Sequence, residues 1–349
     1  MSDGTVDAGG HPGSDALSPW SMPRKAWIQV IKRVYVMIGF HEVGLLAAGL
    51  AFFVFLALTP LIAATVMIYG LVGDTAGVQM QMARIVEVVP GEVAKLIQDQ
   101  LLQIVNTSTG VTGFALVIAL FFAVYGGMRA ASGMISALNI INDEHETRSF
   151  LKLTLRAAGL TLAAVFIALT GLISGGLFAW LQTQTSVFLG GATEFLFKLV
   201  TWAAALALGT AGFALIMRYG PDRRPAKWRW LTPGSILATL LWLMISFGFS
   251  LYVAYISDYN ATYGSLSAIV VFLMWLFLSA YGVLLGAVLN AEIERQTLID
   301  TTVGPARPAG ERGAVLADQV DSSIPNRDVL ETRKRLQAER TRQKADVAQ

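Results

Sequence analysis

Six long apolar stretches separated by short polar breaks dominate the chain between Val43 and Ala291. Four of them contain no charged residue: Val43 to Gly73, Ala157 to Thr193, Trp230 to Ser257 and Tyr259 to Ala291. A helix of about 20 apolar residues crosses a hydrocarbon core, and it satisfies its own backbone hydrogen bonds where water is absent. The pattern predicts an all-α, polytopic membrane protein with six transmembrane helices, near 44–73, 111–138, 156–181, 196–217, 233–257 and 264–290.

Two further helical patterns lie beside these spans. Between Lys25 and Phe40 an apolar stripe recurs at helical spacing beside Lys25, Lys32 and Arg33. This pattern is typical of a basic amphipathic helix on the membrane surface that binds anionic lipid headgroups. The alternative is a simple extension of the first span inside the protein. A second pattern, broken by Pro90-Gly91, predicts a helical hairpin over about 76–106.

The two ends of the chain are polar. Residues 1–23 are rich in Gly, Ser and Pro, which predicts a disordered tail. Residues 299–349 contain Gly304, Pro305, Pro308 and Gly310 near their start and then carry mixed charge, which predicts a flexible tail. The basic and acidic residues of this tail nearly cancel, so no nucleic-acid partner is expected. Residues 24–298 then form one membrane domain.

The distribution of positive charge predicts the orientation. Of 26 Lys and Arg residues, only Arg84, Lys95 and Lys198 fall on one side of the predicted spans, and Arg129 lies inside a span. All others fall on the side that holds both ends of the chain. Because basic residues stay on the cytoplasmic side, both termini are predicted to be cytoplasmic.

Arg129 is the most informative polar residue within a span. A charged side chain there is costly, so it faces an internal cavity or a partner, or it reaches toward the membrane surface. Gly126 and Gly127 beside it permit close approach of another helix or of a ligand. We expect Arg129 to face the bundle interior.

Other candidate pathway residues follow from helix breaks and aromatic clusters. Pro60 inside the first span predicts a kink, either structural or presenting backbone groups to a substrate. Tyr252, Tyr255, Tyr259 and Tyr263 lie where one span ends and the next begins, as an aromatic belt or a substrate-lining face. The Gly282-xxx-Gly286 spacing indicates close helix packing.

Catalytic chemistry is sparse. The chain has no cysteine and three histidines, and its only dense polar cluster is Asp143-Glu144-His145-Glu146 in one short loop. Neighbouring loop residues hold a metal only when distant ligands join them. We expect no metal, no cofactor and no enzymatic activity.

Three stretches resemble the YihY/BrkB family of bacterial inner-membrane proteins, formerly labelled ribonuclease BN-like. They are Ala47 to Phe53 with Pro60, Ala137-Leu138-Asn139-Ile140-Ile141 with Arg148, and Pro233-Gly234 through Tyr263-Gly264-Ser265-Leu266 to Leu284-Leu285-Gly286-Ala287. The resemblance implies six spans, both ends in the cytoplasm and a place in the bacterial inner membrane. It also makes Asn139 a candidate pathway residue.

This chain departs from the family at Val288, where many members carry an acidic residue. Glu292 lies one turn further on the same helical face and is the candidate replacement. Family members have carried a ribonuclease label, an association with serum resistance, or a proposed role in lipid transport.

The sequence therefore favours a transporter or flippase-like protein for an anionic envelope lipid or a small anionic solute. The alternatives are a non-transporting membrane scaffold or envelope-integrity factor and, least favoured, a ribonuclease. A polar mid-membrane cavity would favour transport, a solid apolar bundle a scaffold, and converging acidic or histidine side chains an enzyme. The sequence does not determine the substrate or the state of homo-oligomerisation.

Overall fold

The computed structural model describes residues 10–72, 113–185, 191–255, 266–319 and 323. In this part of the chain every regular element is a helix, apart from one isolated antiparallel bridge between Ala226 and Thr302. The elements in chain order are η1 (Pro19–Ser21), α1 (Arg24–Phe40), α2 (Val43–Val72), α5 (Gly113–Ile141), α6 (Phe150–Thr185), α7 (Gly191–Tyr219), α8 (Trp228–Tyr255), α10 (Ser267–Glu294) and α11 (Val315–Asp318).

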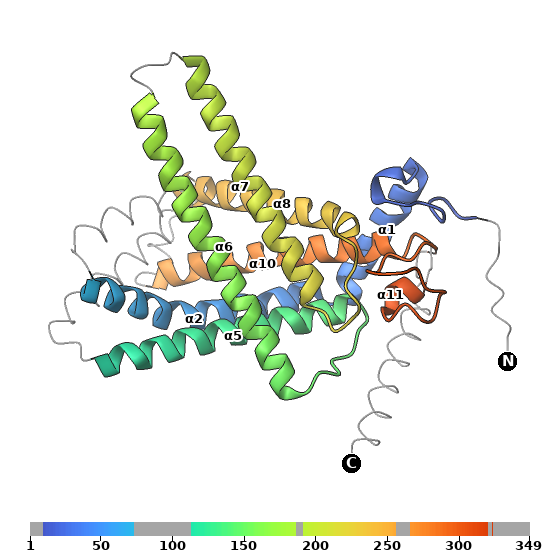
Figure 1. The fold of residues 1–349 in the computed structure, drawn as a ribbon, viewed down its shortest axis with the longest axis horizontal. Helices are drawn as coiled ribbons and strands as arrows, with labels where there is room; N and C mark the ends of the chain where they lie inside the picture. Colours follow the sequence, from blue (N-terminus) through green and yellow to red (C-terminus); the bar gives the residue numbers. More distant parts are fainter. Residues whose placement is uncertain (1–9, 73–112, 186–190, 256–265, 320–322, 324–349) are drawn as a thin grey trace.

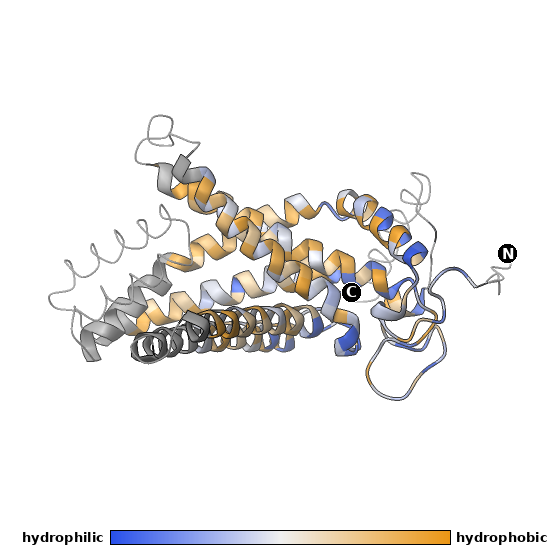
Figure 2. Cartoon of the chain, turned by 90° about the horizontal axis from the view of Figure 1, so that it is seen from above, coloured by the Kyte–Doolittle hydropathy of each residue, from blue (hydrophilic) through white to orange (hydrophobic). Residues whose placement is uncertain are grey.

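Within the described residues five helices, α5, α6, α7, α8 and α10, are long and apolar enough to span a membrane. The bent pair of α1 and α2 makes a sixth candidate. The prediction of an all-α, multi-pass membrane protein is therefore confirmed, with five or six spans. Figure 2 shows hydrophobic residues along the long helices and hydrophilic residues gathered at one end of the bundle. We call this the polar end; the C-terminal ends of α5, α7 and α10 and the N-terminal ends of α6 and α8 lie there (Figure 1).

Helix α10 is at the centre of the bundle. It packs against α8 on one side and α2 on the other, and it also contacts α5 and α1. Helix α5 covers α2, and α7 covers α8. Helices α6 and α7 cross this layer diagonally, with α6 touching α5 and α7 (Figure 1).

The contact between α8 and α10 depends on glycines of both helices, Gly234 in α8 and Gly282 and Gly286 in α10. A Cβ atom added at Gly286 would lie far inside van der Waals contact with the carbonyl oxygen of Gly234, and 3.0 Å from Cβ of Ala238. One turn earlier, a Cβ atom added at Gly282 would lie 3.3 Å from Cβ of Leu241. The close packing predicted from the Gly282-xxx-Gly286 spacing is confirmed. This packing brings Pro233-Gly234 against Leu284-Leu285-Gly286-Ala287. Both segments belong to the third stretch that resembles the YihY/BrkB family.

Asn290 completes this crossing. Its Oδ1 accepts a hydrogen bond from the N–H of Gly234 at 2.7 Å, and its Nδ2 donates to the carbonyl of Leu231 at 2.9 Å. Pro233 lies between these two backbone groups and has no N–H of its own. The Asn290 carboxamide thus bonds to the first turns of α8 beside the proline, where the helix hydrogen-bond ladder is interrupted.

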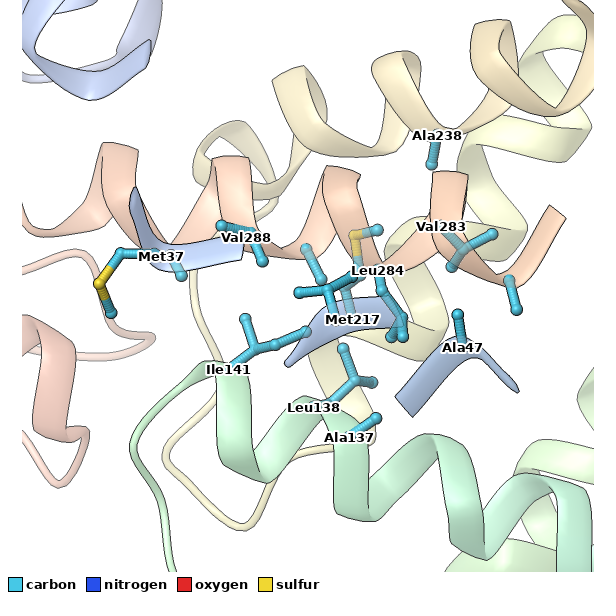
Figure 3. Packing of buried hydrophobic residues seen from close by; sticks show 14 of the residues in the cluster. Met37, Ala47, Ala137, Leu138, Ile141, Met217, Ala238, Val283, Leu284 and Val288 are labelled. Carbon is cyan, nitrogen blue, oxygen red and sulfur yellow. The ribbon is translucent and has the colours of Figure 1, made fainter. Parts of the chain in front are cut away.

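The main hydrophobic core lies toward the polar end, where α1, α2, α5, α7, α8, α10 and α11 each contribute buried residues. Leu284 and Val288 of α10 pack there with Leu138 of α5, Met217 of α7 and Met37 of α1 (Figure 3). Leu316, near the end of the described chain, belongs to the same cluster and is fully buried. The core therefore includes residues far outside the six apolar stretches.

Helix α1 joins α2 at a bend of 62°, and Glu42 at the bend has a positive φ of 51°. The predicted helix over 25–40 is confirmed, and its stripe holds the exposed side chains Ile31 and Tyr35. One detail was wrong. Arg33 is only 1% exposed and faces the protein, so it adds no charge to the exposed surface of α1.

Both chain ends differ from the predicted disorder where the structure describes them. Ala16 and Met22 pack against Trp230 and Ile293, and the carbonyl of Ser14 accepts a hydrogen bond from the N–H of Leu298 at 2.8 Å. Residues 299–319, here called the C-terminal strap, also pack against the polar end. Turn-rich composition predicted flexibility, whereas contacts with the span ends order these segments. The predicted hairpin over 76–106 lies outside the described residues.

Candidate functional site

A groove of about 410 Å³ opens between α2, α5, α6, α7, α8 and α10. Its lining is apolar, with Thr161 and Ser279 the only hydroxyl-bearing residues among the described side chains that line it. The Ser279 hydroxyl is buried and has no hydrogen-bond partner among the residues that the structure describes. On α10 the groove reaches from Leu276 to Val283. Ser279 lies about 22 Å from Glu294 along the helix, so the groove is at mid-depth in the bundle.

Small residues create this groove. The missing Cβ of Gly126 would lie 2.8 Å from Cα of Ala57, so α5 touches α2 there. The missing Cβ of Gly127 would lie 2.8 Å from Cγ2 of Thr161, so α5 also touches α6. Alanine and glycine at neighbouring positions, such as Ala131, leave the space beside these contacts unfilled. The sequence predicted close approach at Gly126-Gly127, but it did not predict which helices meet.

Arg129 does not line the groove. Its side chain is exposed on the outer face of α5, with the guanidinium carbon 6.0 Å from the ring centroid of Phe53 and 5.9 Å from that of Tyr125. The prediction that Arg129 faces the bundle interior is therefore wrong. The turn of α5 that presents Gly127, Ala130 and Ala131 to the groove turns residue 129 outward.

Asn139 lies at the polar end and does not line the groove. Its Nδ2 donates to Glu146 at 3.0 Å, and its Oδ1 accepts from the N–H of Asp222 at 2.7 Å. It therefore ties the loop after α5 to the loop after α7. In the same place Arg148 donates to Glu146 at 2.7 Å and to the carbonyl of Gly220 at 3.0 Å. This geometry gives Asn139 and Arg148 structural roles.

Glu292 is also structural. Its carboxylate accepts from Nε of Arg33 at 2.8 Å, both side chains are 1% exposed, and Nη2 of Arg33 donates to the Glu292 carbonyl at 2.7 Å. The pair holds α1 against the end of α10. Glu292 is nine residues beyond Val283, or about 13 Å along the helix, so it takes no part in the groove.

Two more buried ion pairs surround Glu292. Arg295 pairs with Asp143, and Arg223 pairs with Glu294 at 2.5 Å and donates to Asn142 at 3.0 Å. The partners are 71 to 152 residues apart in sequence. The dense charge at the end of the last apolar stretch was visible in the sequence, but no sequence signal identified the distant partners.

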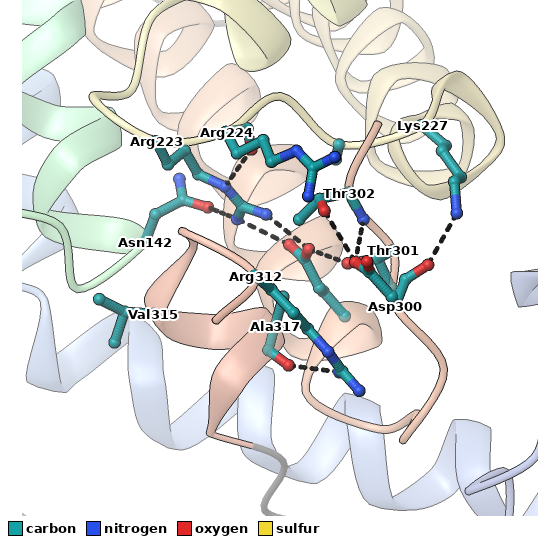
Figure 4. Close-up of polar contacts among 12 residues, drawn as sticks. Asn142, Arg223, Arg224, Lys227, Asp300, Thr301, Thr302, Arg312, Val315 and Ala317 are labelled. Carbon is teal, nitrogen blue, oxygen red and sulfur yellow. Dashed lines mark hydrogen bonds and ion pairs between the residues drawn. The ribbon is translucent and has the colours of Figure 1, made fainter. Parts of the chain in front are cut away.

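The C-terminal strap joins this polar network (Figure 4). The N–H of Lys227 donates to the carbonyl of Thr301 at 2.8 Å, and its Nζ donates to the carbonyl of Asp300 at 2.9 Å. Arg312 donates to the carbonyls of Ala317 and Leu298, both at 2.6 Å. The strap thus closes over the loops that connect the spans at the polar end.

The tyrosine and proline candidates are not brought together at one described site. Tyr252 is exposed and stacks on Phe249 with ring centroids 6.2 Å apart. Tyr255 ends α8, and Tyr259 and Tyr263 lie outside the described residues. Helix α2 is continuous through Pro60. Tyr252 does not line the groove, so the geometry adds nothing to its substrate-lining interpretation.

The acidic loop after α5 is engaged in structural contacts. Asp143 pairs with Arg295, and Glu144 accepts from the N–H of Val315 at 2.8 Å. Glu146 pairs with Arg148 at 2.7 Å. In the described ranges no three His, Asp or Glu residues group in a way that could hold a metal ion.

Glu144 gives the strap contact a pH dependence. Burial raises the pKa of Glu144 from 4.5 to about 7. The Val315 N–H and the Arg223 charge lower this pKa, while Glu294 and Asp222 raise it. Because the folded pKa exceeds the unfolded one, stability linked to Glu144 is complete below pH 4.5 and is lost as the pH rises toward about 7.

We expect the strap to exchange its amide hydrogens faster at pH 7.5 than at pH 5, after correction for intrinsic exchange, because a buried carboxylate resists ionisation. Glu144→Gln keeps an acceptor for the Val315 N–H and should remove this dependence. Hydrogen exchange followed by mass spectrometry measures both proteins. An equal pH dependence in Glu144→Gln would show that another group is responsible.

Comparison with known proteins agrees with this architecture. The family model for virulence factor BrkB matches residues 34–310. YfkH of Bacillus subtilis, described by its name as ribonuclease-like, is 28% identical over 76% of this chain and 95% of its own length. A UPF0761 membrane protein of Paraburkholderia xenovorans is 26% identical over 76% of this chain and 64% of its own length.

A UPF0761 membrane protein of Rhodospirillum centenum is 28% identical over 79% of this chain and 58% of its own length. The chain thus spans about six tenths of these UPF0761 relatives. No solved structure matches the chain. The family model covers most of the membrane bundle and the first part of the strap, so the chain is an integral membrane protein that belongs to the virulence factor BrkB family.

Proposed function

We propose that this protein is a lipid transporter or flippase-like protein that accepts an acyl chain in the mid-depth groove. The groove itself is the observation that carries the proposal. Ligand pockets in proteins measure about 300 to 1,000 Å³ and are mostly apolar, and the groove falls within this range. Its depth matches the hydrocarbon region of a bilayer, where acyl chains are the abundant ligand.

The lining favours a lipid over a small anionic solute. No charged side chain faces the groove among the described residues, and an anion without counter-charge would be costly there. We therefore retain the lipid form of the transport hypothesis. We further propose that the polar end faces the cytoplasm and that the protein lies in the bacterial inner membrane; the charge distribution and the family resemblance support both parts of this proposal.

The alternatives have less support. Four arginines, Arg33, Arg148, Arg223 and Arg295, are each paired with a carboxylate, so a scaffold that recruits partners through a basic surface would depend on exposed cations such as Lys25, Lys32 and Lys152. A metal-dependent ribonuclease needs converging metal ligands. The carboxylates of the loop after α5 instead hold other parts of the polar end together.

Filling the groove is the direct test. Ala131→Trp on α5 and Ala164→Trp on α6 each place an indole in the groove, because both alanines line it. We expect either variant to slow the movement of fluorescent phosphatidylglycerol across reconstituted vesicles by about tenfold or more, since a bulky side chain excludes the acyl chain. Dithionite quenching of the fluorophore measures the rate.

Ala204→Trp is the matched control, because Ala204 is exposed on α7 and does not line the groove. It should move lipid at the wild-type rate. Elution as a single peak from size exclusion would show that all three variants are folded. Folded groove variants that move lipid as fast as wild type would reject the proposal.

A further inference from the structure

Arg129 is a charged residue on the outside of a membrane-spanning helix. It belongs to the candidate span Val117–Ile141 and its side chain is exposed. It lies twelve residues before Ile141, or about 18 Å from the polar end of α5, and about 24 Å from Gly113. The guanidinium therefore lies within the hydrocarbon region and on the surface that faces lipid.

The side chain does not reach toward the polar end. Its guanidinium lies near the ring of Tyr125, which is one turn nearer the N-terminus of α5, and near the ring of Phe53 from α2. Side chains on a helix tilt toward its N-terminus, which agrees with this direction. Arg129 thus points away from the polar end, so it is not an arginine that snorkels to the membrane surface at that end.

Arg129 has no carboxylate partner in the described part of the chain, where its guanidinium contacts two aromatic rings. A second copy of the chain could not provide one at the same depth. The apolar stretches Val43 to Gly73, Val111 to Asn142, Ala157 to Thr193, Phe195 to Pro221, Trp230 to Ser257 and Tyr259 to Ala291 contain no Asp or Glu. The anion that a bilayer itself offers is the lipid phosphate.

Polar side chains continue along the same face of α5. Ser132 and Ser136 follow Arg129 by three and seven residues, which places all three on one side of the helix. Ser136 is exposed and Ser132 is half-buried. Together they form a narrow polar strip on the lipid-facing surface that leads from near the polar end to Arg129.

We propose that Arg129 binds the phosphate of an anionic lipid headgroup at the lipid-facing surface of α2 and α5. The guanidinium stays charged and offers paired donors that match a phosphate, and it forms its strongest hydrogen bonds where water is scarce. The inference rests on the proposed lipid function for the nature of the ligand. It adds the headgroup class, which the apolar groove does not select.

The experiment compares lipids that remain bound. The full-length protein is reconstituted in vesicles of equimolar phosphatidylglycerol and phosphatidylcholine, extracted in mild detergent and analysed by native mass spectrometry. We expect wild type to retain phosphatidylglycerol preferentially. Arg129→Gln should lower that preference by about tenfold, as loss of a charged hydrogen bond predicts. Arg129→Lys should fall between the two, because it keeps the charge and loses the paired donors.

Arg156→Gln is the control, since Arg156 is exposed near the start of α6 at the polar end. It should keep the wild-type preference. A folded Arg129→Gln protein with unchanged preference would overturn the inference, as would an effect of equal size in Arg156→Gln. A change in oligomeric mass by light scattering with unchanged lipid preference would assign Arg129 to a protein contact and also overturn it.

A second measurement keeps the wild-type arginine. Ser132→Cys carries the only cysteine of the chain, and a nitroxide attached to it relaxes nearby phosphorus nuclei. We expect faster phosphorus relaxation for phosphatidylglycerol than for phosphatidylcholine, and equal relaxation would contradict the inference. The outcome for Arg129 can be distinguished from the outcome of the groove test. Ala131→Trp should alter the rate of lipid movement, while Arg129→Gln should alter headgroup preference.

Discussion

Gly286→Ala is expected to prevent stable packing of α8 on α10. The added Cβ would overlap the carbonyl oxygen of Gly234, a backbone atom that cannot move without shifting the helix. Overpacking in protein interiors costs typically about 1–3 kcal/mol, and a clash with backbone belongs at or above the upper end of this range. We expect the melting temperature of the purified protein in detergent to fall sharply, as measured by intrinsic tryptophan fluorescence.

Gly248→Ala is the matched control within α8. A Cβ at Gly248 meets nothing within 4 Å. Alanine favours a helix over glycine by about 1 kcal/mol, so this variant should be as stable as wild type or slightly more so. Equal melting temperatures for Gly286→Ala and Gly248→Ala would show that α8 and α10 do not meet at Gly234 and Gly286.

Removing one partner of the Arg33–Glu292 pair is expected to have an effect of similar size. Both side chains are almost fully buried, so Arg33→Ala or Glu292→Ala leaves one charge without its main partner. Breaking a buried pair in this way costs about 3–5 kcal/mol. We expect α1 to detach from α10, which thermal melting would record as lower stability and limited proteolysis as earlier cleavage near His41.

The double variant Arg33→Met, Glu292→Leu tests whether the two residues act as a pair. Apolar replacements of similar volume remove both buried charges, and such changes are often neutral or stabilising. The double variant should therefore recover most of the stability lost in either single variant. Additive losses in the double variant would mean that Arg33 and Glu292 are not coupled.

The long helices were predictable because they depend on a local property. An uninterrupted apolar stretch must form a helix in lipid, and the predicted spans overlap α2, α5, α6, α7, α8 and α10. At the polar end, α5, α6, α7, α8 and α10 extend past the predicted ends by two to six residues, because turns such as Leu151 to Arg156 remain helical outside the apolar stretch. Hydrophobic pattern does not fix such ends.

The candidate site was less predictable because it depends on rotation and on distant partners. Arg129 and Ala130 are adjacent in sequence, yet one faces lipid and the other faces the groove. Helix α5 carries apolar residues on several of its own faces, so its sequence does not show which face is inside the bundle. The sequence offered Glu292 as a pathway candidate because it does not show that Arg33 lies beside it. Only the fold brings these two residues together.

The C-terminal strap makes the order of chain synthesis important for assembly of the fold. Leu316 packs in the same core as Met37 and Val43, although all the described spanning helices precede it. The spans can therefore enter the membrane one by one while the polar end is still unsealed. The last step of assembly is then the packing of the C-terminal strap, which lies outside the spanning helices. A ribosome that stops after Leu298 would release a fully inserted bundle with an incomplete core.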